Sequence, residues 1–221
     1  MISSKSIFIS DIHLGTKSCK AKRLHDFLSN IECENLFLVG DIIDGWALRR
    51  KHYWTKGQTE VIRKILKLSE KTNVIFIPGN HDDFIRPFFK FDFQIGDIQI
   101  LDSVDYVAID GRRIFVTHGD KFDITMKIPR QIINLFGHFT DGSIIDILYK
   151  YLGQKKLLAK YIKAKGYDCS ISGHTHDPMI EDTYMNCGDW TSKCSALIEH
   201  HDGSWELYYH KKGLLSDETS V

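Results

Sequence analysis

An abrupt change from apolar to polar residues marks the stretch Leu36-Phe37-Leu38-Val39-Gly40-Asp41-Ile42-Ile43-Asp44. The four apolar residues at its start are typical of a central strand that is covered on both faces. Gly40 permits a tight turn where the strand ends, and Asp41 follows directly. In layered α/β proteins the ends of strands gather at one edge, where ligands bind. The stretch therefore predicts a buried strand that carries a carboxylate to such an edge.

Polar loops follow four more predicted strands. They are Asp11-Ile12-His13 after residues 6–9, Gly79-Asn80-His81-Asp82 after 74–77, His118-Gly119 after 114–117 and Gly173-His174-Thr175-His176 after 169–172. Apolar residues at helical spacing over 24–31 and 61–68 predict helices between the first three strands. Asp110-Gly111 and Asp202-Gly203 are hairpin turn signals in the β-rich second half. This order predicts an α/β fold of stacked mixed sheets with helices outside.

Length and composition narrow the class of protein. The chain has 221 residues, with 29 basic and 29 acidic side chains, and its formal net charge is zero. It contains no repeat or linker, so we expect residues 1–221 to form a single domain. Balanced charge argues against a nucleic-acid partner. The five cysteines include no Cys-x-x-Cys pair, which predicts reduced thiols and a cytoplasmic location.

Residues 121–166 differ from the rest of the chain. They contain nine Lys or Arg and three Asp, and so carry a charge of +6. Apolar residues recur there at helical spacing, which predicts a helical insertion between two core strands. Two interpretations stay open. The helices could pack on their own core with solvated lysines, or their apolar faces and basic excess could meet acyl chains and an anionic lipid headgroup or membrane surface.

The five polar loops share one chemistry. A single Asp or His after a strand is usually a turn cap or a structural residue, but here every such loop carries one. Carboxylates and imidazoles without thiolates suit manganese, iron or zinc rather than a cysteine-rich structural zinc. The set of two Asp, four His and one Asn is too large for one ion. Two ions bridged by a carboxylate would fit it, and such a pair lowers the pKa of a bridging water for displacement at phosphorus.

The motifs Asp11-x-His13, Gly40-Asp41-x-x-Asp44, Gly79-Asn80-His81-Asp82, His118-Gly119 and Gly173-His174-x-His176 resemble, in the same order, those of the calcineurin-like metallophosphoesterases. The resemblance implies a metal-dependent hydrolase of phosphoric esters or pyrophosphates, in which a metal-bridged hydroxide attacks phosphorus. It implies a sandwich of two mixed sheets flanked by helices, with the site at their shared edge. It also implies two divalent metal ions, for which we expect manganese, with iron or zinc as alternatives.

The resemblance implies a role for each motif residue. The first metal ion would be held by Asp11, His13 and His176, and the second by Asn80, His118 and His174. Asp41 would bridge the two ions. His81 matches the catalytic or phosphate-contacting histidine of the family, placed to stabilise developing charge or to protonate the leaving group. Asp82 would orient His81.

A finer resemblance concerns the substrate. The stretches from Gly40 to Trp46 and from Asn186 to Trp190 resemble the branch of UDP-2,3-diacylglucosamine pyrophosphatases. These enzymes cleave a pyrophosphate in lipid A synthesis and carry a helical lid where residues 121–166 lie. The resemblance therefore implies a lipid substrate and peripheral contact with the inner face of the membrane. One departure is that the best-known members have Arg at the position of His81.

Three side chains near the motifs are candidate substrate contacts. Trp46 and Trp190 each follow a site loop and could stack on a base or sugar, and Arg86 lies in an apolar, basic segment after the Gly79 loop. The leading function is hydrolysis of the pyrophosphate of a lipid-linked nucleotide. One alternative is a phosphodiesterase or phosphatase for soluble nucleotides or phosphoesters. Another is a scaffold of the same fold without catalysis, which the complete set of ligands disfavours.

Overall fold

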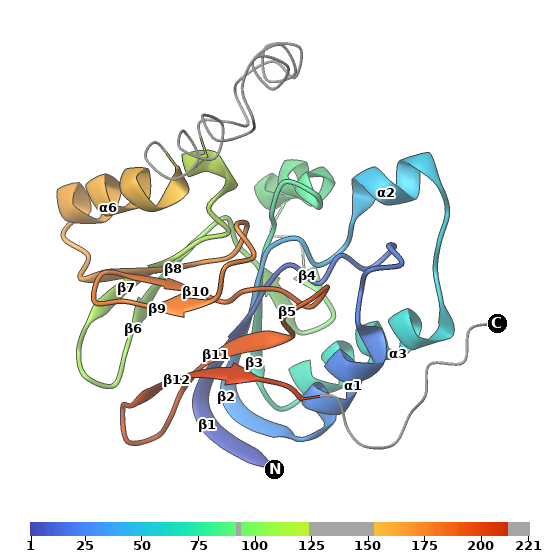
Figure 1. Cartoon of the computed structure of the whole chain (residues 1–221), viewed down its shortest axis with the longest axis horizontal. Coiled ribbons are helices and arrows are strands. Elements are labelled where there is room, and N and C mark those ends of the chain that lie inside the picture. The colour runs from blue at the N-terminus through green and yellow to red at the C-terminus, as the bar shows by residue number, and fades with distance from the viewer. Residues whose placement is uncertain (92–93, 124–152, 212–221) are drawn as a thin grey trace, which may run out of the picture.

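The computed structural model describes residues 1–91, 94–123 and 153–211 (Figure 1). Among these residues, two β-sheets form the centre of the molecule. The first sheet has the order β12 (Trp205–Tyr209), β11 (Ser195–Glu199), β1 (Ile2–Ile9), β2 (Ile31–Val39), β3 (Asn73–Ile77), β5 (Ile98–Ile100) and β4 (Gln94–Ile95). The second sheet has the order β6 (Val104–Val107), β7 (Arg113–Val116), β8 (Cys169–Ser172), β10 (Tyr184–Asn186) and β9 (Met179–Ile180). Both sheets contain parallel and antiparallel pairs.

Helices cover the outer faces of both sheets (Figure 1). The α-helices are α1 (Ala21–Ser29), α2 (Gly45–Arg50), α3 (Lys56–Ser69) and α6 (Gln154–Lys165), and short 3-10 helices are η1 (Asp83–Phe91) and η2 (Asp120–Phe122). The apolar residues of α1 and α3 pack on the first sheet, and those of α6 pack on the second. The α/β sandwich of two mixed sheets flanked by helices is therefore confirmed.

Alternation along the strands explains why the sheets stack. In β1, Ile7 and Ile9 belong to the cluster under α1 and α3, whereas Phe8 belongs to the cluster between the two sheets. Successive side chains of a strand point to opposite faces, so a fully apolar strand contributes to two cores. The Phe8 ring stacks on Phe37 of β2 at 4.5 Å between centroids. A strand with this pattern needs a layer on each side.

Parallel register places the strand ends in line. β1, β2 and β3 are parallel neighbours, with Ile9 opposite Leu38 and Val39 opposite Ile77. In the second sheet, β7 and β8 are parallel, and Val116 lies opposite Ile171. The loops after these five strands are the five polar loops of the sequence. Strand register therefore brings them to one edge of the sandwich, as expected.

The insertion predicted at residues 121–166 falls partly within the described residues. Its last part forms α6, which ends at Gly166 with a left-handed φ of 73°. Residues 124–152 lie outside the described residues, so the insertion as a whole, and the single domain over 1–221, stay predictions. No helix of the described residues is long and apolar enough to cross a membrane. All five cysteines are free thiols.

Candidate metal centre

The predicted metal ligands meet where the ends of the parallel strands converge. His118 Nε2 lies 3.3 Å and His13 Nε2 lies 3.8 Å from Asp41 Oδ2. His176 Nε2 lies 3.1 Å from Asp11 Oδ1. These side chains come from the loops after β1, β2, β7 and β8. Residues far apart in the chain therefore share one largely buried cluster, which we call the ligand cluster: Asp11, His13, Asp41, His118, His174 and His176.

Three overlapping triads in and beside the ligand cluster have the spacing of a metal site. One combines Asp11, His13 and His176, and another combines Asp41, His118 and His174. The third consists of His13, Asp41 and His81. In each triad the candidate ligand atoms lie within 4.8 Å of one another. The first triad contains the three residues expected at the first ion. The second contains His118 and His174, two of the three expected at the second ion, together with Asp41, the expected bridge. Asp41 Oδ2 also lies 3.8 Å from His13 Nε2 of the first triad.

Five of the seven candidate ligand residues have an unusual backbone conformation. Left-handed φ angles occur at Asp11 (53°), His13 (52°), Asp41 (54°), His174 (71°) and His176 (55°). Residues with a Cβ avoid this region, at a cost of about 1–2 kcal/mol each. Such strain persists only where the surroundings hold it, and it is typical of functional sites. Here backbone hydrogen bonds hold the loops together, because the Asp11 N–H donates to the Gly40 carbonyl at 3.0 Å and the His13 N–H donates to the Asp41 carbonyl at 2.9 Å.

Two glycines let the ligand cluster close. A Cβ on Gly79 would lie 2.2 Å from Asp41 Oδ1, and a Cβ on Gly173 would lie 2.5 Å from Asp11 Oδ2. Both distances are far below van der Waals contact. Any larger residue would displace a carboxylate of the cluster, which explains glycine in these two motifs.

Four candidate ligand atoms are buried without a hydrogen bond to any described residue. They are Asp11 Oδ1, His13 Nε2, Asn80 Oδ1 and His118 Nε2. An unsatisfied buried polar atom costs about 1–3 kcal/mol, so four together require an explanation. His118 provides part of this explanation, because one of its ring nitrogens already has a partner: Nδ1 lies 2.9 Å from the Val39 carbonyl oxygen. With the proton on Nδ1 alone, the lone pair of Nε2 would be available to a metal ion in the cluster. The donor set fits two divalent cations.

Electrostatics also favour positive charge in the ligand cluster. Burial opposes ionisation of Asp41, but nearby histidines, above all His118, outweigh it and hold the pKa of this carboxyl well below its usual range. Burial alone would lower the pKa of His118, yet the carboxylates of Asp41, Asp11 and Asp120 raise it to about 10. The cluster thus has the negative potential that attracts divalent ions.

His81, the predicted catalytic histidine, lies beside the ligand cluster and is positioned by Asp44. Its Nε2 is 4.0 Å from Asp41 Oδ2, and its Nδ1 is 3.0 Å from Asp44 Oδ2. Asp44 Oδ2 also lies 3.1 Å from His13 Nδ1, while its Oδ1 accepts from the Ala47 N–H at 2.6 Å. One carboxylate therefore orients a candidate ligand and the candidate catalytic ring while capping α2.

The expectation that Asp82 orients His81 needs correction. Within the described part of the chain, the Asp82 carboxylate accepts from the backbone N–H groups of Ile42, at 2.7 Å, and of Gly79. It ties the β2 and β3 loops together instead of meeting the His81 ring. Burial, followed by the charge of Asp41, raises its pKa to about 7.

The three candidate substrate contacts differ in their placement. Trp46 is 38% exposed, and its ring centroid lies 4.2 Å from the ring centroid of His81. Trp190 is fully buried, and its ring centroid lies 5.1 Å from that of Phe27. A substrate cannot stack on it, so the prediction for Trp190 is wrong. Arg86 Nη2 donates to the Pro78 carbonyl and to Asp120 Oδ2, both at 2.9 Å.

This engagement gives Arg86 a different role from the expected one. Pro78 precedes the loop of Asn80, and Asp120 follows the loop of His118. The guanidinium therefore holds together two loops that carry candidate ligands, and its Nη2 is used within the protein.

Sequence reasoning missed two residues that support the ligand loops. His174 Nε2 lies 2.9 Å from Asp123 Oδ2, and Gln154 Nε2 donates to the carbonyl oxygens of His118 at 3.2 Å and Gly173 at 3.4 Å. Neither residue directly follows a strand, so the pattern that identified the ligands could not find them. Their role depends on tertiary contacts alone.

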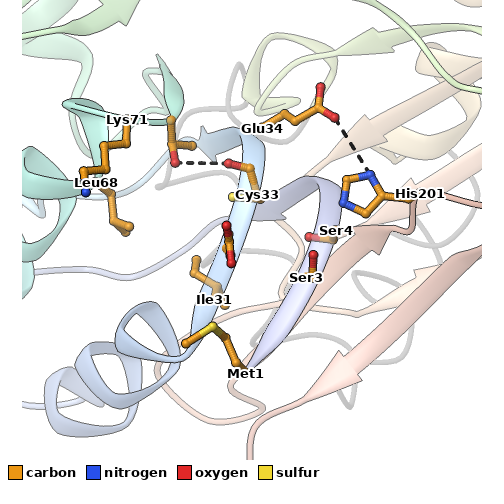
Figure 2. A pocket seen from close by; sticks show the side chains of 11 residues that line it. Met1, Ser3, Ser4, Ile31, Cys33, Glu34, Leu68, Lys71 and His201 are labelled. Carbon is orange, nitrogen blue, oxygen red and sulfur yellow. Dashed lines mark hydrogen bonds and ion pairs between the residues drawn. The ribbon is translucent and has the colours of Figure 1, made fainter.

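A cleft of about 470 Å³ lies elsewhere in the molecule (Figure 2). It is lined by Ser3 and Ser4 of β1, by Ile31 to Glu34 of β2 and by Lys71, among others. These residues lie at the amino ends of the two strands, whereas the candidate ligands follow the carboxyl ends. The cleft is therefore separate from the candidate metal centre.

Comparisons with known proteins show what the chain is similar to. A sequence model of the family described as calcineurin-like phosphoesterase matches residues 4–178. The UDP-2,3-diacylglucosamine hydrolase of Vibrio atlanticus (strain LGP32) is 26% identical, over 88% of this chain and 93% of that protein. The hydrolase of the same name from Shewanella sp. (strain ANA-3) is 22% identical, over 90% and 95%. Among solved structures, Yfce, a phosphoesterase from E. coli, has a TM-score of 0.48 and 17% identity, and the match covers 93% of this chain and 99% of that one.

Proposed function

The chain belongs to the calcineurin-like phosphoesterase family of metal-dependent phosphoester hydrolases, and we propose that it hydrolyses the pyrophosphate of a lipid-linked nucleotide such as UDP-2,3-diacylglucosamine. The relatives named for that substrate support the proposal, because they match nearly the whole length of the chain, at 22% and 26% identity. The observation that carries the hydrolase chemistry is the convergence of candidate ligand atoms into triads within 4.8 Å of one another, among described residues that include four buried ligand atoms without a hydrogen bond.

Seven residues would hold two metal ions. We assign Asp11, His13 and His176 to one ion, Asn80, His118 and His174 to the other, and Asp41 to both. When bound, two divalent ions supply Lewis-acid polarisation of the phosphoryl group and lower the pKa of water. Manganese is the proposed metal, with iron and zinc as alternatives, because the donors are imidazoles and oxygens without thiolates.

His81 is the proposed catalytic side chain. Its ring is partly exposed beside the ligand cluster. Asp44 Oδ2 lies 3.0 Å from Nδ1, so Nε2, which is 4.0 Å from Asp41 Oδ2, is the nitrogen that would face a substrate. In that position it would stabilise charge on the phosphoryl oxygens or protonate the leaving group. Trp46 lies against the same ring and would offer its exposed face to the base or sugar.

The place of action is part of the proposal. A lipid substrate requires access to a membrane, and we propose a cytoplasmic protein that contacts the inner membrane face through residues 121–166. The exposed lysines of α6, such as Lys160 and Lys163, support this proposal, because basic residues are attracted to anionic lipid headgroups.

Activity measurements on ligand variants test the chemistry. Asp41→Ala and His118→Ala should each lose Mn²⁺-dependent hydrolysis of bis(p-nitrophenyl) phosphate while circular dichroism shows an unchanged fold. Asp105→Ala is the matched control, because Asp105 is an exposed carboxylate on β6 whose partner is the Tyr167 hydroxyl. Full activity in either ligand variant would contradict the assignment, as would purified wild-type protein that binds no metal, which is expected of a scaffold.

A substrate panel tests the lipid assignment. We expect UDP-2,3-diacylglucosamine to be hydrolysed with a higher kcat/KM than UDP-sugars without acyl chains, cyclic nucleotides or simple phosphoesters. A preference for a soluble substrate would instead support the alternative of a phosphodiesterase or phosphatase for soluble nucleotides and phosphoesters.

A further inference from the structure

His174, a candidate ligand of the second ion, has one ring nitrogen occupied by a buried carboxylate. Its Nε2 lies 2.9 Å from Asp123 Oδ2, and Asp123 is only 5% exposed. The two ring nitrogens of a histidine are distinct, and a hydrogen bond to one determines which of them is available to a metal. With Nε2 next to Asp123, Nδ1 is the nitrogen left for an ion beside Asp41 and His118.

The backbone around this pair holds both partners. The His174 N–H donates to Asp11 Oδ2 at 2.9 Å, which connects His174 to the first triad. The Asp123 N–H donates to the Asp120 carbonyl at 3.1 Å, and η2 begins directly after His118 and Gly119. Asp123 is thus attached to the loop of one candidate ligand while its side chain contacts another.

The ring of His174 also faces that of His118. Their centroids are 5.2 Å apart at an interplanar angle of 77°. A rotation of the His174 ring would move its nitrogen away from the cluster that it forms with Asp41 and His118. The contact with Asp123 opposes that rotation, since a charged acceptor forms a stronger hydrogen bond than a neutral one.

We propose that Asp123 is a positioning residue for the second metal ion, which fixes the His174 ring with Nδ1 toward Asp41 and thereby sets the affinity of that ion alone. The inference rests on the proposed function, because it requires a protein that binds two ions. Carboxylate partners of metal-bound histidines typically contribute about 10–100-fold to metal affinity. The first ion, held by Asp11, His13 and His176, should be unaffected.

Binding of Mn²⁺ alone to the metal-free full-length chain tests the proposal, with no need for a substrate. Isothermal titration should resolve two ions for the wild type. In Asp123→Ala we expect one ion to bind as in the wild type and the other about 10–100-fold more weakly. Asp123→Asn should fall between the two, because its amide oxygen still accepts a hydrogen bond but carries no charge. Asp105→Ala and Asp105→Asn are matched controls and should bind both ions normally.

Electron paramagnetic resonance of the same samples gives a second readout. Two neighbouring Mn²⁺ ions give an exchange-coupled spectrum in the wild type once two ions are bound per chain. At the same Mn²⁺ concentration, Asp123→Ala should leave its weakened site largely empty and show the spectrum of isolated ions. Melting temperatures in EDTA separate this role from a structural one, and they should agree between wild type and Asp123→Asn.

Three results would overturn the proposal. Normal affinity for both ions in Asp123→Ala would refute the positioning role and leave the proposed function intact. An equal loss of both ions together with a lower melting temperature in EDTA would show a structural role instead. A wild-type protein that binds no Mn²⁺ would refute the proposed function itself. If Asp123→Ala does not fold, the affinities of Asp123→Asn decide between the same outcomes.

Discussion

Gly79→Ala is a substitution whose effect follows from steric contact alone. The added Cβ would lie 2.2 Å from Asp41 Oδ1 and 2.6 Å from His118 Nε2. Closest acceptable contact is about 3.0 Å, so the Asp41 carboxylate must move by roughly 1 Å. It cannot do so freely, because Asp41 Oδ1 accepts from the His81 N–H at 2.8 Å. One added methyl group therefore acts on the proposed bridging ligand, one candidate ligand of the second ion and the proposed catalytic residue at once.

The size of the effect can be estimated from this displacement. A misplacement of about 1 Å in a catalytic geometry can cost about 10²-fold in rate, and overpacking a tight interior costs about 1–3 kcal/mol of stability. We expect kcat for bis(p-nitrophenyl) phosphate with Mn²⁺ to fall by about 10²-fold or more. Metal content should fall below two ions per chain, and urea denaturation should show the loss of stability.

Gly57→Ala is the matched control. A Cβ on Gly57, in α3, would meet its nearest neighbours only at 3.8 Å. Gly57 is the second residue of α3, so alanine there should not lower stability and should leave activity unchanged. If Gly79→Ala matched Gly57→Ala in activity and metal content, the close approach of the Gly79 loop to Asp41 would not matter to the site, and the reasoning would be refuted.

Three further predictions concern the surroundings of the ligand cluster. Arg86→Ala should lower the free energy of unfolding by about 1–3 kcal/mol, because it leaves the buried Asp120 without its partner, and Arg86→Lys should restore only part of it in urea denaturation. Trp46→Ala should raise the KM for a nucleotide substrate about 10-fold, as expected for a stacking contact, and leave the KM for bis(p-nitrophenyl) phosphate unchanged. The control Trp54→Ala removes another exposed tryptophan and should change the KM of neither substrate. Burial would raise the pKa of Asp189, but hydrogen bonds from residues 191 and 192 outweigh burial and lower this pKa in the folded protein. The ionised Asp189 therefore stabilises the fold above its unfolded pKa of about 4, and this stabilisation is lost as the pH falls from there through the lower folded pKa. Asp189→Asn should therefore reduce the loss of stability on acidification, measured by urea denaturation from pH 3 to 7, and an identical pH profile would contradict this.

Strand ends were the most informative part of the sequence. The run from Leu36 to Val39 has apolar residues on both faces, and such a strand requires a layer on each side, so the stacked architecture could be predicted. The candidate ligands follow their strands directly, and parallel register then brings them together. Local pattern and tertiary position agree here because parallel neighbouring strands place their carboxyl ends at the same edge of the sheet.

Side-chain direction could not be predicted in the same way. Asp82 is next to His81 in the sequence, and Asp44 lies in the preceding motif. The conformation of the loops alone decides that Asp44 contacts the His81 ring, while Asp82 accepts from backbone N–H groups. Trp190 follows a polar loop, yet its side chain points into the core against Phe27. A polar neighbour in sequence does not tell which way a large apolar side chain turns.

The ligands of the candidate metal centre come from both halves of the chain. Each triad that matches an expected ion includes a histidine from the loop after β8, His174 or His176, next to residues from the β1 or β2 loops. A metal ion at either triad would therefore act as a cross-link between distant parts of the chain, in a protein whose cysteines are all free thiols. During synthesis neither ion can find its full set of donors until β8 and its loop have left the ribosome. Metal loading is thus expected to follow the synthesis of β8 and its loop.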